Sequence, residues 1–205
     1  PLNNPGNTST LFYDGIDRVV RSEQDLRVGG TGDGALDTSN PTNPDGKVTL
    51  LQDWDGNSRL TSQTDDRGKV TSYLYDALDR RKQETFHDLT THVWTFDRDD
   101  NVSVFTDANE SVRTCDYDAV NRLVSCSVAR GPGVVGTTLQ AWEYDGLTRT
   151  TRATDNNELS LPADDSVVTC FYDSLSRKVE EHQALNGNVQ VVSWDWEADD
   201  LRVGM

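Results

Sequence analysis

The sequence has few hydrophobic side chains, which make up 34% of its 205 residues. Ordinary globular domains contain roughly 45 to 50% apolar residues, so we expect a thin core. No apolar run is long enough to span a membrane, and residues 1–10 have neither the basic nor the apolar part of a signal peptide. The sequence therefore predicts no membrane span. Because it does not begin with Met, we interpret it as an excised or processed piece, which leaves the route of export open.

Basic residues are also scarce, since 19 Lys and Arg stand against 35 Asp and Glu, for a formal net charge of -16. Such a field repels phosphate backbones and anionic lipid, which excludes nucleic acid as a partner. Five Trp, six Tyr and five Phe nevertheless argue against disorder, because disordered acidic chains are poor in aromatics. The chain is therefore expected to fold around its aromatic residues.

Cysteine is nearly absent, and its three copies are Cys115, Cys126 and Cys170. They are too few and too scattered for a disulfide framework or a metal site. If Tyr117 pairs with Arg122 across a turn, Cys115 and Cys126 are diagonal neighbours, with Cα atoms about 7 to 8 Å apart and beyond the usual disulfide limit. A bulge in the turn would shift this register by one residue. Without it, we predict three free thiols.

Motifs of catalysis are missing as well. The sequence has no Gly-x-Ser-x-Gly, no His-Glu-x-x-His and no P-loop. Among the three histidines, His87 and His92 are five residues apart, which on a strand places them on opposite faces and makes a poor metal pair. The sequence therefore predicts neither an enzyme nor a cofactor.

Acidic clusters raise the question of calcium. The runs at 53–57 and 97–101 begin like an EF-hand loop but lack the Gly at its sixth and the Glu at its twelfth position. An insertion near 27–47 carries a Gly-rich run at 29–34 with Asp and Asn residues after it, which fits either a calcium cradle or a polar loop. Because the two acidic runs coincide with turns of the repeat described next, we predict no bound metal.

What the sequence does have is a repeated motif, an aromatic followed by Asp with Arg or Asn four residues later. An eighth, degenerate copy begins at Trp196. Trp54, Tyr75, Phe96 and Tyr117 follow one another at intervals of 21 residues, and longer intervals elsewhere indicate insertions between fixed units. The seven clear copies comprise Tyr13, Asp14, Arg18; Trp54, Asp55, Arg59; Tyr75, Asp76, Arg80; Phe96, Asp97, Asn101; Tyr117, Asp118, Arg122; Tyr144, Asp145, Arg149; and Tyr172, Asp173, Arg177.

Each copy reads as a β-hairpin. The residue two before the aromatic is apolar or aromatic in seven of eight copies, and the residue directly before it is mixed, which indicates a strand with one buried face. A second extended run such as 60–63 or 123–126 follows each Arg. At the position two before the aromatic, some copies have Cys or Leu and others have Trp or Tyr. We therefore expect these side chains to pack in the interior rather than to present rings to a sugar or a protein partner.

The turn explains the polar residues of the motif. An Asp before a four-residue loop accepts backbone N–H bonds and fixes the turn. The residue before the Arg is expected in the left-handed conformation, which suits Asp79 or Asn121 but fits Thr148 badly. The Arg is expected to tie successive hairpins together through the Asp or a neighbouring carbonyl. We therefore predict a structural role for both residues.

The motif resembles the YD repeat of RHS-repeat proteins, whose consensus is Tyr-Asp-x-x-Gly-Arg. The closest copies are 75–80 and 117–122, and both replace the family Gly. The resemblance covers Leu11 to Met205. It implies a long antiparallel strip of hairpins that spirals into a hollow shell, as in bacterial RHS and Tc-type toxins and teneurins. Toxin members end in a core domain with an Asp-Pro motif that releases a C-terminal effector, and this sequence has no Asp-Pro.

The sequence thus predicts an all-β fold, with a polar segment at 1–10 and a hairpin array of about eight repeats at 11–205. About 16 strands would form a strip that must curl. The function implied by the resemblance is a non-catalytic scaffold, a shell segment that encapsulates or presents a toxin or effector in a secreted or cell-surface protein. Its partners are then the remainder of the shell or an enclosed polypeptide. The alternative is an adhesion or carbohydrate-binding module that recognises a glycan or a cell-surface protein through its loops.

Overall fold

The computed structural model describes residues 8–28, 35–39, 41–157, 165–185, 187–196 and 202–204, the last of these for the backbone alone. The chain divides into two compact units, Pro1–His92 and Val93–Met205. The described residues contain no α-helix, so the predicted all-β class is confirmed. No helix in this described part is long and apolar enough to cross a membrane.

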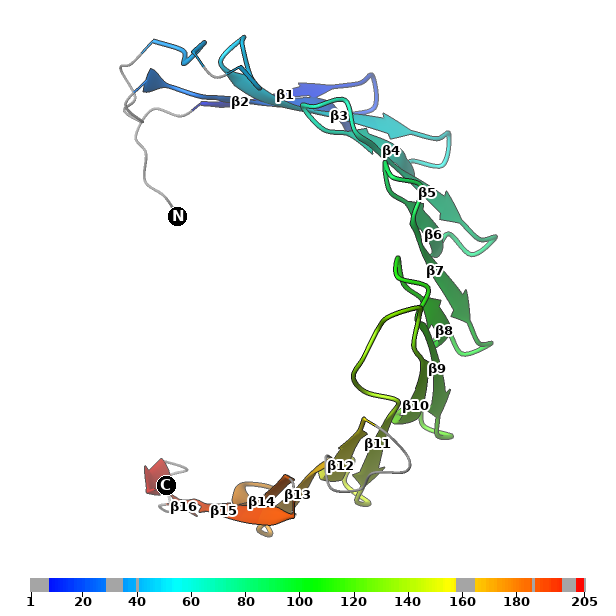
Figure 1. Cartoon of the computed structure of the whole chain (residues 1–205), viewed down its shortest axis with the longest axis vertical. Helices are drawn as coiled ribbons and strands as arrows, with labels where there is room; N and C mark the ends of the chain where they lie inside the picture. Colours follow the sequence, from blue (N-terminus) through cyan, green and yellow to red (C-terminus); the bar gives the residue numbers. More distant parts are fainter. Residues whose placement is uncertain are drawn as a thin grey trace. The chain divides into compact units, whose positions relative to one another are not determined.

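The first unit contains six strands and the start of a seventh (Figure 1). Neighbouring strands pair antiparallel in sequence order, from β1 with β2 to β5 with β6. The strands are β1 (Ser9–Tyr13), β2 (Val19–Asp25), β3 (Lys47–Trp54), β4 (Leu60–Thr64), β5 (Val70–Tyr75), β6 (Arg81–Thr85) and β7 (Thr91–Phe96).

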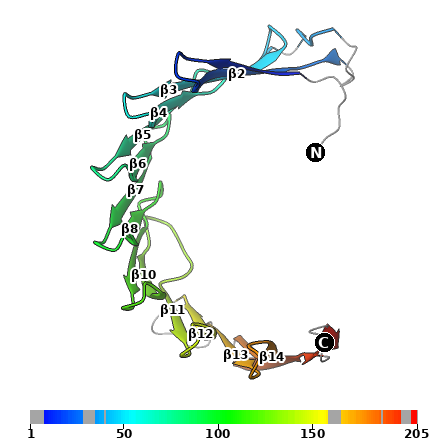
Figure 2. The same cartoon turned by 180° about the vertical axis from the view of Figure 1, so that it is seen from behind.

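The second unit continues in the same way (Figure 2). Its strands are β8 (Val102–Thr106), β9 (Val112–Tyr117), β10 (Leu123–Ala129), β11 (Leu139–Tyr144), β12 (Thr150–Asn156), β13 (Ser166–Tyr172), β14 (Lys178–Leu185), β15 (Asn188–Ser193), β16 (Asp195–Trp196) and β17 (Arg202–Gly204). The sheet order runs from β1 to β15 without a crossover, and β16 pairs with β17 in a separate ladder. The expected strip of about 16 strands is therefore a sheet of 15 and a separate pair.

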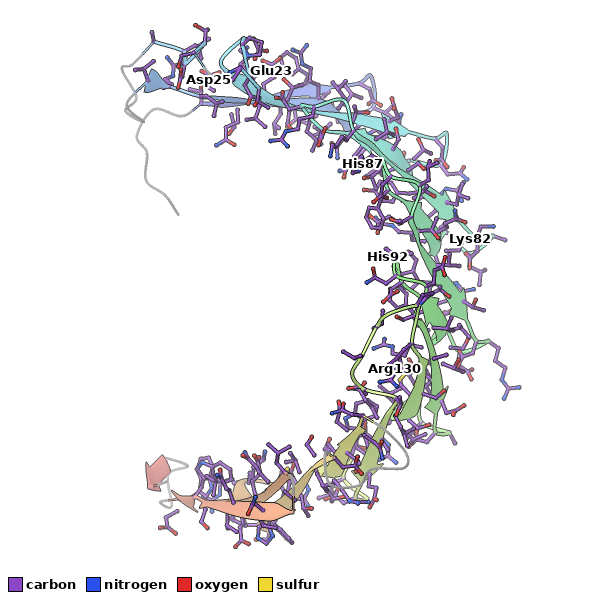
Figure 3. The ribbon with its side chains drawn as sticks, in the orientation of Figure 1. Glu23, Asp25, Lys82, His87, His92 and Arg130 are labelled. Atoms are coloured by element: carbon purple, nitrogen blue, oxygen red, sulfur yellow. A yellow bond between two sulfur atoms is a disulfide. The ribbon has the colours of Figure 1, made fainter. Side chains whose placement is uncertain are left out.

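A β-bulge recurs where each aromatic-Asp turn closes its hairpin. Tyr75 lies opposite Arg81 and Leu74 lies opposite Gln83, which leaves Lys82 unpaired on the bulged strand. Lys82 is exposed, and Figure 3 shows its side chain projecting away from the ribbon. The same register shift directly precedes the aromatic in the hairpins whose first strand ends at Tyr13, Trp54, Phe96, Tyr144 or Tyr172.

The bulge overturns the prediction of three free thiols. Cys115 lies directly opposite Cys126 rather than diagonal to it, and the two form a disulfide with Cα atoms 4.1 Å apart. The expected register, with Tyr117 opposite Arg122, places Cys126 opposite Arg113, two residues away from its observed partner. Tyr117 in fact lies opposite Leu123, which accounts for one residue of this shift, and the bulge accounts for the other. Cys170 is the free cysteine.

The core is thin, as the composition indicates. Among the described hydrophobic residues, Tyr73, Cys115 and Cys126 are buried. Both Tyr73 and Cys115 stand two residues before a motif aromatic, whereas Leu74, directly before one, is 52% exposed. The alternation along these strands therefore follows the predicted pattern, with most inner residues half-buried because a single sheet layer covers them on one side only.

Candidate functional site

Each motif Asp fixes its own turn. In the hairpin of β5 and β6, Oδ1 of Asp76 accepts the backbone N–H bonds of Leu78 and Arg80 at 2.9 and 3.0 Å. The backbone N–H of Asp76 in turn donates to the carbonyl of Arg80 at 2.9 Å. All seven motif Asp residues accept the same two N–H bonds, at 2.8 to 3.0 Å.

The residue before each Arg or Asn has a positive φ, as predicted. The seven values lie between 61° and 67°, for Asp17, Ser58, Asp79, Asp100, Asn121, Thr148 and Ser176. Thr148 adopts this conformation although it is β-branched. The turn geometry is thus kept even where the side chain is unsuited to it.

The Arg of each turn binds its own Asp. In six turns the guanidinium Nε donates to Oδ2 of the Asp at 2.6 to 2.7 Å. The side chains of these pairs are 20 to 27% exposed, so they are only partly screened by water. In the remaining turn, Asn101 donates its Nδ2 to Asp97 at 3.0 Å.

The same guanidinium also reaches forward to the next hairpin. Nη1 of Arg122 donates to the backbone carbonyl of Asp145 at 3.3 Å, and its Cζ lies 4.7 Å from the centre of the Tyr144 ring. Such a distance is typical of a cation–π contact. An Arg lies 4.7 to 5.9 Å over the aromatic of the next copy in the pairs Arg18 and Trp54, Arg59 and Tyr75, Arg122 and Tyr144, Arg149 and Tyr172, and Arg177 and Trp196.

The aromatic reaches back to the preceding hairpin. The hydroxyl of Tyr144 donates to the carbonyl of Leu123, the residue directly after Arg122, at 2.8 Å. Six copies make the equivalent bond at 2.8 to 3.2 Å, in the pairs Trp54 to Val19, Tyr75 to Leu60, Tyr117 to Val102, Tyr144 to Leu123, Tyr172 to Thr150 and Trp196 to Lys178. We call the forward Arg contact and the backward aromatic bond together the hairpin junction.

The sequence analysis missed the backward hydrogen bond. It treated the rings as packing residues, although a signal was present, because seven of the eight motif aromatics are Tyr or Trp and carry a donor. Phe96 has no such donor and cannot form the bond. The junction also spans the insertion near 27–47, since Trp54 still reaches Val19 at 2.8 Å.

The turns at the other ends of the strands use the same device and were also missed. Asp107 accepts the backbone N–H bonds of Asn109 and Ser111 at 2.9 Å, and Glu110 has a φ of 65°. Asp65 makes the equivalent bonds to the N–H groups of Arg67 and Lys69. The sequence analysis did not single out these segments, because no aromatic-Asp motif marks them.

The loop between β10 and β11 packs on one of these turns. The backbone N–H of Gly131 donates to Oγ of the buried Ser111 at 3.1 Å. A Cβ on Gly131 would lie 1.8 Å from the carbonyl oxygen of Asn109. Side-chain adjustment cannot relieve this overlap, because both groups belong to the backbone.

We expect Gly131→Ala to lower the free energy of unfolding by about 1 to 2 kcal/mol, since overpacking against backbone forces the loop to move. Denaturant unfolding measures the change. Gly146→Ala is the matched control, because a Cβ there meets nothing within 4 Å, and it should change stability by less than about 0.5 kcal/mol. Equal effects of the two substitutions would contradict the packing of this loop.

The hydrogen bonds of the turns lower the pKa of the motif acids. The backbone N–H of Arg122 is the largest contributor that lowers the pKa of Asp118, and the side chain of Arg80 is the largest for Asp76. The pKa is also lowered for Asp14, Asp55, Asp97, Asp145 and Asp173. These carboxylates therefore favour the ionised state in the folded protein.

Acid should destabilise the fold for this reason. A lowered folded pKa contributes stability that is present above the unfolded value, about 3.9 for Asp, and is lost as pH falls through the folded pKa. We expect the Tm to stay level from neutral pH to about pH 5 and to fall steeply below about pH 4. Thermal melts across this range measure it. A Tm that stays level or rises below pH 4 would contradict the role of the carboxylates in the turns.

The histidines do not form a site in the described residues. The prediction that His87 and His92 lie on opposite faces of a strand is wrong, because His87 lies in the turn between β6 and β7 (Figure 3). The ring of His92 packs edge-on against Phe86 at 4.8 Å, and its Nδ1 lies 3.6 Å from Glu84. No cluster of three or more His, Cys, Asp or Glu side chains that could hold a metal is present in the described part of the chain.

The acidic segments considered for calcium have other partners where they are described. Asp55 and Asp97 fix turns, and Asp53 accepts a hydrogen bond from Ser62 at 2.7 Å. In the insertion, Asp37 accepts bonds from Ser39 and Asp45 accepts one from Lys47. The Gly-rich run at 29–34, the residue at 40 and the Glu after Trp196 lie outside the described residues.

The acids at the end of β2 are paired too (Figure 3). Glu23 is 4% exposed, binds Lys47 at 2.6 Å and also pairs with Arg21. Asp25 binds Arg27 at 2.6 Å. Two cations around the buried Glu23 compensate the loss of its hydration.

Comparison with known proteins identifies the repeat. Residues 54–85 match the family model described as RHS Repeat. No curated protein matches the chain. The matched segment holds the motif copies at Trp54 and Tyr75 with the turn between them, so the resemblance to RHS-repeat proteins is confirmed.

Solved structures share the fold. The Tc holotoxin pore of Photorhabdus luminescens matches with a TM-score of 0.71 and 15% identity, over 96% of this chain and 11% of that one. The TcdB2-TccC3 structure without its hypervariable C-terminal region matches with a TM-score of 0.55 and 13% identity, over 97% and 12%. The TcdB2-TccC3-Cdc42 structure gives 0.53 and 14%, over 94% and 12%. This chain thus spans about a tenth of those chains.

Proposed function

We propose that this chain is a non-catalytic scaffold, a segment of an RHS-repeat β-shell that encloses or presents a toxin or effector polypeptide. The hairpin junction carries the proposal. A donor on the aromatic and a cation on the Arg connect successive hairpins, and the pattern recurs from Trp54 to Trp196 except in the copy of Phe96 and Asn101. A sheet in which the same contacts join successive hairpins is suited to forming the wall of a shell around another polypeptide.

The engagement of the charged motif residues supports a structural role. The 21 residues of the seven copies are proposed to hold the array at 11–205 together. The Asp oxygens accept backbone and Arg bonds, and the Arg groups contact their own turn and the next ring. Both oxygens of each motif carboxylate are engaged within the turn, which favours a structural role over acid–base catalysis.

The matched structures support an enclosed partner. They carry the names of a holotoxin and of TcdB2-TccC3 assemblies, one of them lacking a hypervariable C-terminal region. By analogy, the partners of this chain are the rest of a shell and a polypeptide inside it. The Cys115–Cys126 disulfide supports a secreted or surface location, because disulfides persist in oxidising compartments.

Limited proteolysis of the natural polypeptide that contains this chain tests the proposal. An enclosed segment should resist protease while the shell is intact and should be cleaved faster when Arg122→Gln and Tyr144→Leu weaken one junction. Arg98→Gln is the matched control, because Arg98 is 93% exposed and should leave protection unchanged.

Two outcomes would contradict enclosure. One is a polypeptide without any protected segment, and the other is protection that is unaffected by the junction variants although they lower the Tm. Binding of a glycan that is lost on the same substitutions without a change in Tm would favour the adhesion module instead.

A further inference from the structure

Two neighbouring turns of the first unit, at the strand ends opposite the motif turns, form a cleft. β5 and β6 pair with each other, so the turn at 65–69 before β5 lies beside the turn at 86–90 after β6. The cleft between them has a volume of about 420 Å³. It is lined from the first side by Lys69 and Val70 and from the second by Phe86, His87 and Leu89. We call these five residues the turn cleft.

The apolar floor of the turn cleft consists of Val70, Phe86 and Leu89. Phe86 is half-buried, whereas Val70 is 44% exposed and Leu89 is 82% exposed. Leu89 also has a φ of 69°, which is unfavourable for a bulky side chain. The equivalent residue of the preceding turn is Gly68, with a φ of 72°. A strained and exposed Leu, at a position that suits Gly, points to a contact that the chain itself does not make.

Two cations stand at the rim of the turn cleft. Arg67 and Lys69 are both exposed, in a chain whose formal net charge is -16. Among the residues that the structure describes, neither side chain takes part in a hydrogen bond or an ion pair. Their N–H donors are therefore available to an acidic partner.

The acids of the two turns are engaged elsewhere. Asp65 accepts the backbone N–H bonds of its own turn at 2.9 and 2.8 Å, and Asp66 accepts the backbone N–H of Thr49 at 2.7 Å. Asp88 accepts both the backbone N–H and the hydroxyl of Thr90, at 3.1 and 2.7 Å. These carboxylates thus stabilise turns and do not bind the two cations at the rim.

The shape and charge of the turn cleft select the class of partner. Pockets for small molecules bury 70 to 90% of their ligand, which a cleft bordered by the exposed Leu89 cannot do. One apolar side chain of a polypeptide can pack there as part of a larger contact. Polymers of phosphate are repelled by the net charge of the chain, whereas a few carboxylates can meet Arg67 and Lys69 directly.

We propose that the turn cleft binds a polypeptide segment in which an apolar side chain lies between two acidic ones. The apolar side chain packs on the floor, and one carboxylate binds Lys69 or Arg67. The other carboxylate accepts a hydrogen bond from the His87 ring. The inference is independent of the proposed enclosure, because it holds equally for an enclosed and for an external partner.

A short peptide provides the probe. In acetyl-Glu-Ser-Phe-Ser-Glu-amide, the two acids and the ring share one face when the peptide is extended. Titrated into the full chain, it should shift the NMR amide resonances of residues 67–70 and 86–89, with a Kd below about 1 mM, and leave those of β12 unchanged. The same peptide with Lys in place of both Glu residues should not bind, and added salt should weaken binding of the acidic peptide.

Two substitutions separate binding from folding. Leu89→Gly removes part of the floor and relieves the positive φ, so it should keep or raise the Tm and weaken binding about threefold or more. Lys69→Gln should weaken binding about threefold. Lys82→Gln is the matched control, because Lys82 is also exposed but lies at the other end of β6 and projects away from the ribbon (Figure 3), so it should keep the affinity.

Several results would overturn the inference. They are the absence of binding at peptide concentrations up to about 1 mM, equal affinity of the basic peptide, or unchanged affinity of Leu89→Gly. Phenylacetate that binds as tightly as the peptide would show a small-molecule site instead. A dimer detected by sedimentation, with resonance shifts in the turn cleft on self-association, would assign the cleft to a second copy of the chain.

Discussion

Tyr144→Ala lowers the free energy of unfolding by about 2 to 4 kcal/mol, the largest loss that we expect from a single motif side chain. The substitution removes a half-buried ring, its contact with the Arg122 guanidinium at 4.7 Å and its hydrogen bond to Leu123 at 2.8 Å. Urea unfolding followed by tryptophan fluorescence measures the change.

Two variants of the same hairpin separate the contributions to this loss. Tyr144→Phe keeps the ring and removes the hydrogen bond, so it should cost about 0.5 to 1.5 kcal/mol. Leu147→Ala truncates a side chain that is 67% exposed at the tip of the turn and should cost less than about 0.5 kcal/mol. If Leu147→Ala destabilises as much as Tyr144→Ala, the aromatic has no special role.

Reduction of the Cys115–Cys126 disulfide destabilises the protein by about 3 kcal/mol, the value expected for a closed loop of this length. The bond joins β9 and β10 between directly opposed residues, and Cys126 is fully buried. Thermal melts with and without reductant measure the effect. Cys170→Ala should keep the response to reductant, because Cys170 takes no part in the bond.

Thiol titration of the denatured protein gives an independent count. Without reductant it should find one thiol, and after reduction it should find three. Three thiols before reduction would show that Cys115 and Cys126 are not bonded. A Tm unchanged by reductant would show that the bond does not stabilise the fold.

The sequence was sufficient to predict the hairpins because their turns are local. An Asp such as Asp76 accepts N–H bonds from residues two and four positions ahead, and the left-handed residue at Asp79 lies in the same loop. The alternation of Tyr73 and Leu74 likewise depends on neighbours in sequence. Each feature was therefore visible in one copy and supported by the others.

The contacts between hairpins could not be predicted in the same way. The bulge at residue 124 changes which residues face each other across β9 and β10, and one position decides whether Cys115 meets Cys126. The bond from Tyr144 to the Leu123 carbonyl joins residues 21 positions apart. No local rule specifies these pairings, and only the choice of Tyr and Trp over Phe hinted at the second.

The packing of the loops inserted between hairpins could not be predicted from local sequence either. The close approach of Gly131 to Asn109 depends on the path of the loop after β10, which its Gly-rich sequence leaves undetermined. The predicted boundaries at 1–10 and 11–205 remain predictions, as does the stabilising role of the 21 motif residues.

A double-mutant cycle between Arg122 and Tyr144 tests most directly whether the junction holds successive hairpins together. Arg122→Met and Tyr144→Leu are measured singly and together by urea unfolding, and Arg98→Met with Tyr144→Leu serves as the unlinked control. Because Arg122 lies 4.7 Å over the ring, the account predicts a coupling of about 0.5 to 1 kcal/mol for the first pair. It predicts additivity for the control. Additive effects for Arg122 and Tyr144 would contradict the junction as the contact that joins the hairpins.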